Sequence, residues 1–138
     1  MTKARVAAAL CLGLILQGCG ISSPSDNRVE TFSGSVQPLN FGVSHPFSVT
    51  NVGSREIKIT LTSLVPGNAF LGILYGQPAG NGCGAFQTAV VDTTAGRNSL
   101  TGFIQIAGQY CVQVFDPVNT VGIPLPVTQN YTLQVSHP

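Results

Sequence analysis

The strongest constraint on the fold of this chain is an alternation of apolar and polar side chains that repeats every two residues. In segment 57–62, two isoleucines and a leucine alternate with a lysine and two threonines, and segments 110–114 and 131–136 are similar. Successive side chains of a β-strand point to opposite faces, so this alternation is typical of strands with one face in a core. The period of an amphipathic helix does not recur along the chain. The sequence therefore predicts an all-β fold.

Five other segments have the composition of short strands, and turn-forming residues separate them. These predicted strands are residues 30–36, 46–50, 69–75, 85–91 and 99–106. Together with the three segments above they give about eight strands in a single domain spanning residues 29–138. One sheet of that size could not cover its own apolar face, so we expect two antiparallel sheets packed as a β-sandwich.

The N-terminus carries a separate signal. Lys3 and Arg5 precede an apolar run over residues 6–16, and the sequence Leu-Gln-Gly-Cys follows at its end, with the cysteine at position 19. The run has about eleven residues, whereas a helix needs roughly twenty apolar residues to span a bilayer. A basic start, an apolar centre and a small residue before the cleavage point are the parts of a secretory signal, which is removed and does not fold.

This N-terminus resembles the lipobox signal peptide of bacterial lipoproteins, although Gln17 stands where a small or aliphatic residue is usual. The resemblance implies that residues 1–18 are removed and that Cys19 is acylated with fatty acids such as palmitate, which anchor the protein in the cell envelope. Gly20, where a retention signal would often place Asp, implies the outer membrane. Residues 19–28 are predicted to tether the domain close to its membrane. An ordinary signal cleaved nearby is the alternative.

The remaining cysteines fit an oxidising compartment. Cys11 lies in the signal and Cys19 at the predicted lipid attachment point, which leaves Cys83 and Cys111 as one pair. We predict that they form a disulfide, which would stabilise the fold by about 3 to 4 kcal/mol. Two free thiols, or a redox role, remain the alternatives.

Charge and the scarcity of catalytic side chains exclude several function classes. Beyond Cys19 the chain has four basic and five acidic side chains. It therefore has no basic stripe for nucleic acid. Calcium needs six to eight oxygens, several of them from carboxylates, and Asp92 and Asp116 are interpreted as turn formers. His45 and His137 are both expected to be solvated. We predict no catalytic residue, metal or cofactor, and a hydrolase is the remote alternative.

The C-terminal half resembles the bacterial pre-peptidase C-terminal domain. The residues that carry the resemblance are Ala107 to Val114, with the pattern small-Gly-x-Tyr-x-Val-x-Val, and the closing Tyr131-Thr132-Leu133-Gln134-Val135. The resemblance implies a jelly-roll-like sandwich that serves as an accessory module of secreted proteins. Members that bind calcium have acidic side chains where residues 68–71 stand here. An immunoglobulin-like sandwich is the rival fold, but it places its tyrosine two residues before the cysteine and packs a Trp on the disulfide.

These observations favour a non-enzymatic binding or accessory module that docks to another envelope or secreted protein, with a polysaccharide-binding module as the alternative. The glycine-rich loop 76–84 is the best candidate site, because glycine lets a ligand approach the backbone and Cys83 would fix the loop. Its candidate binding residues are Gly76, Gln77, Asn81 and Gly82. Five phenylalanines could anchor a partner if exposed, although most are expected in the core: Phe41, Phe70, Phe86, Phe103 and Phe115. A polar rim could be formed by Arg55, Glu56 and Lys58.

Overall fold

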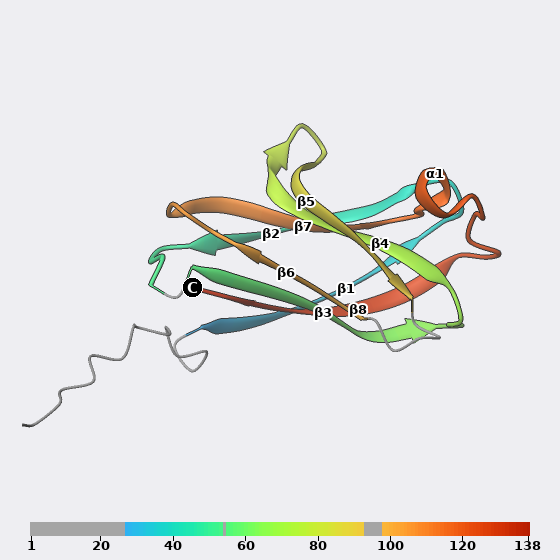
Figure 1. The fold of residues 1–138 in the computed structure, drawn as a ribbon, viewed down its shortest axis with the longest axis horizontal. Coiled ribbons are helices and arrows are strands. Elements are labelled where there is room, and N and C mark those ends of the chain that lie inside the picture. Colours follow the sequence, from blue (N-terminus) through green and yellow to red (C-terminus); the bar gives the residue numbers. More distant parts are fainter. Residues whose placement is uncertain (1–26, 54, 93–97) are drawn as a thin grey trace, which may run out of the picture.

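Two four-stranded antiparallel sheets pack face to face in the computed structural model, which describes residues 27–53, 55–92 and 98–138 (Figure 1). The strands are β1 (Arg28–Val36), β2 (Phe41–Val49), β3 (Glu56–Val65), β4 (Phe70–Ala79), β5 (Gly82–Asp92), β6 (Ser99–Phe103), β7 (Gly108–Phe115) and β8 (Gln129–His137). One sheet has the order β1-β8-β3-β6 and the other the order β2-β7-β4-β5. All eight predicted strands are present, and the all-β antiparallel sandwich is confirmed.

The strand order is that of a jelly roll. Strands β1 and β2 lie in different sheets, and only β4 and β5 are consecutive in the chain and adjacent in a sheet. This order interlocks two Greek keys, as in other eight-stranded jelly rolls. In the immunoglobulin fold, by contrast, the first two strands are neighbours in one sheet. The rival fold is therefore excluded by connectivity, although its number of strands is similar.

The core lies between the sheets and is built from the apolar halves of the alternating strands. Ile57, Ile59 and Leu61 of β3 are buried, as are Tyr131 and Leu133 of β8. Fully burying an aliphatic side chain of this size stabilises a fold by roughly 1.5 to 3 kcal/mol, so these rows hold the sheets together. The outward residues of the same strands are mostly Thr, Ser, Gln and Lys. The predicted alternation thus places each side chain on the expected face.

The two ends of the sandwich differ in what they carry. At one end, which we call the tether end, β1 begins and β8 finishes, since Arg28 pairs with His137. The β2–β3 and β6–β7 connections lie at this end, on the left of Figure 1. The opposite far end holds the β1–β2, β3–β4 and β7–β8 connections, including the short helix α1 (Val118–Val121). This helix was not predicted, because four residues are too few to show a helical period.

The β4–β5 hairpin bends away from the sheet and rises above it in Figure 1. The pairing register shifts between Tyr75 and Gly76, so that Phe86 on β5 has no partner residue on β4. An extra residue of this kind is a β-bulge, which bends the strand and redirects its side chain. A Cβ atom added at Gly76 would overlap the carbonyl oxygen of Gly84, so only glycine permits the bend.

Among the described residues, no helix has the length and apolar character needed to cross a bilayer.

Candidate functional site

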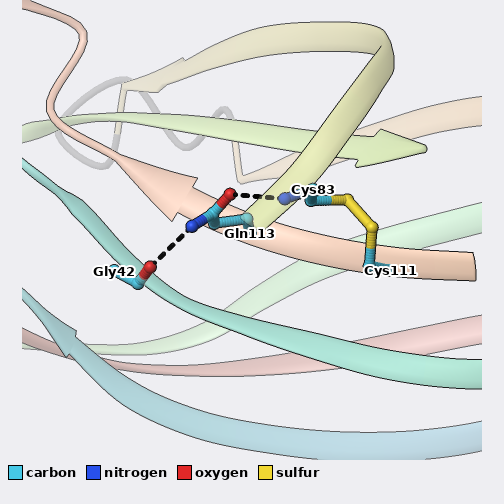
Figure 2. Close-up of a disulfide and its surroundings, with 4 residues drawn as sticks. All are labelled: Gly42, Cys83, Cys111 and Gln113. Carbon is cyan, nitrogen blue, oxygen red and sulfur yellow. Dashed lines mark hydrogen bonds between the residues drawn. A yellow bond between two sulfur atoms is a disulfide. The ribbon is translucent and has the colours of Figure 1, made fainter. Parts of the chain in front are cut away.

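The disulfide fixes the bent hairpin onto the outer face of the sheet (Figure 2). Cys83 of β5 and Cys111 of β7 are bonded, with their Cα atoms 5.8 Å apart, which confirms the predicted pairing. Strand β4 lies between these two strands in the sheet order, and its Gly76 pairs with Cys111. The bridge therefore joins strands that are not neighbours, across a position that has no side chain.

Gln113 is a second connection at the same place. Its side chain is almost completely buried and points out of the sheet beneath the hairpin. The Nε2 amide donates to the Gly42 carbonyl of β2 over 2.7 Å, and Oε1 accepts the Cys83 N–H at 3.2 Å. One amide therefore links β2, β7 and β5. The sequence does not single it out, since the alternation predicts an ordinary solvated glutamine there.

The predicted glycine-rich loop is mostly strand. β4 continues to Ala79 and β5 begins at Gly82, which leaves a two-residue turn at Gly80 and Asn81. Gly76 is closed against Gly84, and Gly82 lies near the side-chain amide of Gln113. The glycine backbone is thus used for packing within the protein rather than left open to a ligand. Among the four candidate binding residues, Gln77 lines a cavity.

That cavity, of about 390 Å³, opens beside the tether end. We call it the tether-end cleft, and its lining residues are Gln77, Phe86, Phe103, Gln105, Ile106 and Tyr110. The bulge aims the Phe86 ring edge-on at Tyr75 and Tyr110, with ring centroids 6.4 and 6.3 Å apart. The side chains of Phe86, Phe103 and Ile106 are nevertheless 58–70% exposed. Three large apolar groups therefore face solvent around one opening.

Side chains from the opposite sheet form hydrogen bonds with backbone N–H and carbonyl groups on the free edge of β6, beside this cleft. The Tyr75 hydroxyl accepts the Phe103 N–H at 3.1 Å and donates to the Phe103 carbonyl at 3.2 Å. Gln87 Nε2 donates to the Thr101 carbonyl at 3.2 Å. Unpaired strand edges can recruit another strand, so these bonds disfavour strand addition at β6. A partner at the tether-end cleft would therefore bind through contacts with apolar side chains rather than through backbone hydrogen bonds.

A second apolar surface lies at the far end. Two cavities of about 530 and 320 Å³ share Ser35 and Val43 and run over the β1–β2 edge. Around them the side chains of Phe41, Val43 and Val65 are 57–65% exposed. We call this surface, formed by Ser35, Phe41, Val43 and Val65, the far-end groove. The Phe41 ring stacks on Phe115 with centroids 5.5 Å apart, so the groove has a firm aromatic wall.

Leu39 precedes Asn40, which lines the smaller of these two cavities, and has an unusual backbone conformation. Its side chain is 69% exposed, and its backbone has a φ of 63°, in the left-handed region. For a residue other than glycine that region costs roughly 1–2 kcal/mol. The carboxylate of Asp116 accepts the Leu39 N–H at 2.7 Å and so holds the residue there. This bond therefore keeps an exposed apolar side chain in a fixed backbone conformation.

The expectation that most of the five phenylalanines lie in the core is wrong. Phe41, Phe70, Phe86 and Phe103 are all exposed by more than a third, and Phe115 is half-buried. Strands with side-chain alternation place every second residue outward, and these four lie on outward or edge positions. The buried phenylalanine of the core is instead Phe47.

The expectation that both histidines are solvated is also wrong. His137 is fully buried, because β8 continues through it; its Nε2 lies 3.2 Å from Glu30 Oε1, and its ring packs on Phe47. His45 is half-buried, and its Nε2 lies 3.0 Å from the Tyr131 hydroxyl. Burial lowers the pKa of His45 and raises the pKa of Tyr131 to about 12. The long-range strand pairing that buries these rings has no local sequence signal.

The charged residues are structural or exposed. Asp116 is buried and accepts the N–H groups of Leu39, Val118 and Leu125, so it does form a turn but also joins distant segments. Arg55, Glu56 and Lys58 are exposed at the tether end. Within the described ranges, no three His, Cys, Asp or Glu side chains are grouped as metal ligands would be. Cys19, the predicted lipid attachment residue, lies outside the described residues.

Comparison with known proteins supports the fold. No family model and no curated protein sequence matches this chain. Its structure is similar to that of Aeromonas hydrophila PliG, a periplasmic lysozyme inhibitor of g-type lysozyme, with a TM-score of 0.52, 15% identity, and coverage of 83% of this chain and 90% of that one. It is also similar to the Yersinia pseudotuberculosis-derived mitogen YPM, with a TM-score of 0.49, 16% identity, and coverage of 81% and 87%. At such identities the likeness concerns the fold alone.

Proposed function

We propose that this protein is a lipid-anchored, non-enzymatic binding module of the bacterial cell envelope that docks a protein partner at the far-end groove. The anchor is Cys19, acylated after removal of residues 1–18, and the outer membrane is the proposed site. The partner is an envelope or secreted protein.

The observation that carries the proposal is the row of exposed apolar residues at the end opposite the anchor. Leu39 in the turn before β2, and Phe41 and Val43 in β2 itself, are each 62–69% exposed. Because the tether reaches β1 at the other end, this row points away from the membrane. Exposed aromatic and aliphatic groups bordered by polar residues are typical of protein-binding surfaces. The rim here is polar and uncharged, formed by Ser35, Asn40 and their neighbours.

Two further considerations support a binding role. The described histidines are both engaged in hydrogen bonds and ring packing, His45 with Tyr131 and His137 with Glu30, rather than with a nucleophile. PliG, which shares the fold, is a periplasmic inhibitor of g-type lysozyme, so a sandwich of this kind can act on an enzyme in the same type of compartment. A g-type lysozyme is accordingly the first defined partner to test.

The test compares two double variants with matched residue types. Phe41→Ser with Val43→Ser removes the far-end groove, whereas Phe103→Ser with Val29→Ser removes a phenylalanine and a valine of similar exposure near the tether end. After mild crosslinking in membranes, the unaltered chain and the tether-end variant should retain one stoichiometric protein partner. Recovery by the far-end variant should fall at least about tenfold, since interface hot spots are worth about 2 kcal/mol or more. Inhibition of g-type lysozyme, where present, should fall in parallel.

Equal recovery by both variants would exclude the far-end groove. Binding to a glycan array without any protein partner would favour the polysaccharide-binding alternative. A hydrolytic activity that survives purification and disappears when a histidine or an acid is replaced would overturn the non-enzymatic assignment. The anchor is checked separately: Cys19→Ser should move the protein from the membrane fraction to the soluble fraction, because the acyl chains supply the attachment.

A further inference from the structure

We propose that the tether end of the sandwich is a lipid-contacting surface, in which Phe86, Phe103 and Ile106 enter the interface of the membrane that carries the anchor. The inference rests on the proposed anchoring of Cys19. It adds that the folded domain itself touches lipid and so has a fixed orientation, with the far-end groove directed away from the bilayer.

The first argument is covalent reach. Eight peptide units separate Cys19 from Asn27, the residue before β1, and a fully extended chain spans at most about 3.6 Å per residue. The tether is therefore at most about 29 Å long. Strands of 8 to 11 residues run along most of the sandwich, and each residue of a strand adds about 3.3 Å. A flexible tether of eight residues spans only about 16 Å on average, about half the roughly 30 Å length of the nine-residue strand β1, so the end at which β1 begins stays closer to the membrane than the far end.

The second argument is the placement of exposed apolar groups at that end. Phe103 finishes β6, and Ile106 lies in the β6–β7 connection; both belong to the tether end. Phe86 stands beside them because the bulge in β5 turns it toward the same cleft. The free edge of β6 is already satisfied by Tyr75, so a strand from a protein partner gains little here. Large apolar side chains without an open strand edge suit the disordered interface of a bilayer.

The third argument is charge. Within the part of the chain that the structure describes, every lysine and arginine lies toward the tether end: Arg28, Arg55 and Lys58. Their side chains are exposed, and Arg28 forms an ion pair with Glu30, with Nε and Oε1 3.4 Å apart. Glu30 and Glu56 lie at the same end, so three basic and two acidic side chains leave it a net charge of +1, whereas Asp92 and Asp116 lie at the far end. Each basic residue near an anionic lipid surface adds about 1 kcal/mol of attraction. A phospholipid surface with anionic headgroups therefore complements the tether end in both polarity and charge.

The experiment exploits the absence of tryptophan from the chain. Ile106→Trp at the tether end and Ile123→Trp at the far end are a matched pair, since these isoleucines are 62% and 64% exposed. Each full-length acylated variant is reconstituted into vesicles of phosphatidylethanolamine and phosphatidylglycerol that contain brominated lipid. We expect quenching of Trp fluorescence to be at least about threefold stronger for Ile106→Trp, with a blue-shifted emission, because interfacial side chains lie about 5–10 Å deep.

A second measurement tests whether basic side chains attract the tether end to anionic lipid. In the Ile106→Trp background, Arg55→Asn with Lys58→Gln should weaken quenching in anionic vesicles and leave it unchanged in vesicles of phosphatidylcholine alone. Asparagine is chosen because Arg55 has a φ of 58°, which asparagine tolerates. Identical unfolding midpoints of the variants show that the domain is intact.

The outcomes separate this inference from the anchor itself. If the chain floats with the vesicles but the two tryptophans are quenched equally or not at all, the lipid contact is overturned and the anchor stands. If the chain does not float, and Cys19→Ser behaves identically, the anchor fails and the lipid contact fails with it. Stronger quenching of Ile106→Trp in floating protein, lost with Cys19→Ser, supports both.

Discussion

Asp116 joins two connecting segments of the far end through a single carboxylate. Its oxygens accept the N–H groups of Leu39 at 2.7 Å, Leu125 at 3.0 Å and Val118 at 3.1 Å. The first belongs to the β1–β2 connection and the other two to the segment between β7 and β8. Bonds to a charged acceptor are stronger than neutral ones, so this residue shapes the rim of the far-end groove.

Asp116→Ala is therefore expected to lower the free energy of unfolding by about 3 kcal/mol, because buried N–H groups would lose their acceptor. Urea denaturation followed by circular dichroism measures the change. Glu56→Ala is the control: its side chain is exposed, and a change within about 0.5 kcal/mol is expected there. A loss of less than about 1 kcal/mol for Asp116→Ala would show that the three bonds contribute little.

Tyr131 links stability to pH in the alkaline range. Burial raises the pKa of its hydroxyl to about 12, from an ordinary value of about 10. The unfolded chain therefore loses this proton first. The stability that the neutral hydroxyl contributes is fully present below pH 10 and is lost as the pH rises through 12.

We expect the free energy of unfolding to fall between pH 10 and pH 12 in the unaltered chain and to fall less steeply in Tyr131→Phe. At neutral pH the same variant should lose about 1 kcal/mol, since the bond to His45 disappears. Urea titrations at several pH values measure both effects. Identical slopes for the two proteins would mean that Tyr131 ionises as easily in the folded state as in the unfolded one.

At the scale of elements, the β4–β5 hairpin depends on three separate devices. Gly76 permits the bend, and the Gln113 side chain binds the backbone of β5. The disulfide links β5 to β7 across β4. None of these contacts involves the inner face of the sheet. The hairpin is thus a small outer layer, attached to the sandwich and not part of its core.

Replacing Cys83 and Cys111 with Ala should lower the free energy of unfolding by about 3.5 kcal/mol, the chain-entropy value for a bridge between residues 28 apart. Amide exchange should increase most at the hairpin, around Gly82, and least in β3. Cleavage of the bridge by a reductant in the unaltered chain should reproduce both results. Uniformly faster exchange across all strands would instead show that the bridge supports the whole sandwich.

Sequence reasoning succeeded where side chains alternate and failed where contacts are long-range. The strand of Ile57, Ile59 and Leu61 needs only its local pattern, and the pairing of Cys83 with Cys111 follows from elimination. The burial of His137 depends on Phe47 and Glu30, which lie about ninety and a hundred residues away in the chain. No local pattern records such a contact.

The candidate site was predicted in part for the same reason. The glycines of the hairpin were recognised, but whether they face a ligand or a neighbouring strand depends on the bulge at Phe86. The far-end groove, formed by Ser35, Phe41, Val43 and Val65, was missed because its members come from three strands and a phenylalanine alone does not reveal its exposure. The sequence did carry one usable sign, since Leu39, Phe41 and Val43 alternate as apolar residues beside a turn.

For the molecule as a whole, β8 is the strand on which the most pairing depends. It lies between β1 and β3, and its register with β1 is unbroken from Arg28–His137 to Val36–Gln129. Its inward residues Tyr131, Leu133 and Val135 are buried in the core. Without β8, strand β1 has no partner in its sheet.

A chain that ends at Thr128 should consequently be unfolded by circular dichroism, because it loses both a central strand and three core side chains. A synthetic peptide with residues 129–138 should restore the β-sheet signal when added in trans. The same peptide with Leu133→Asp should not, since a charge would replace a core leucine. A truncated chain that melts cooperatively on its own would show that the other strands suffice.

The pairing of the first strand with the last also sets the timing of folding in a cell. The sheet that contains β1 cannot close until the ribosome has released β8, because β8 is the neighbour of β1 in that sheet. Pairing of strands so far apart in sequence is intrinsically slow. The first strand made therefore waits without a sheet partner while the six strands between it and β8 are synthesised.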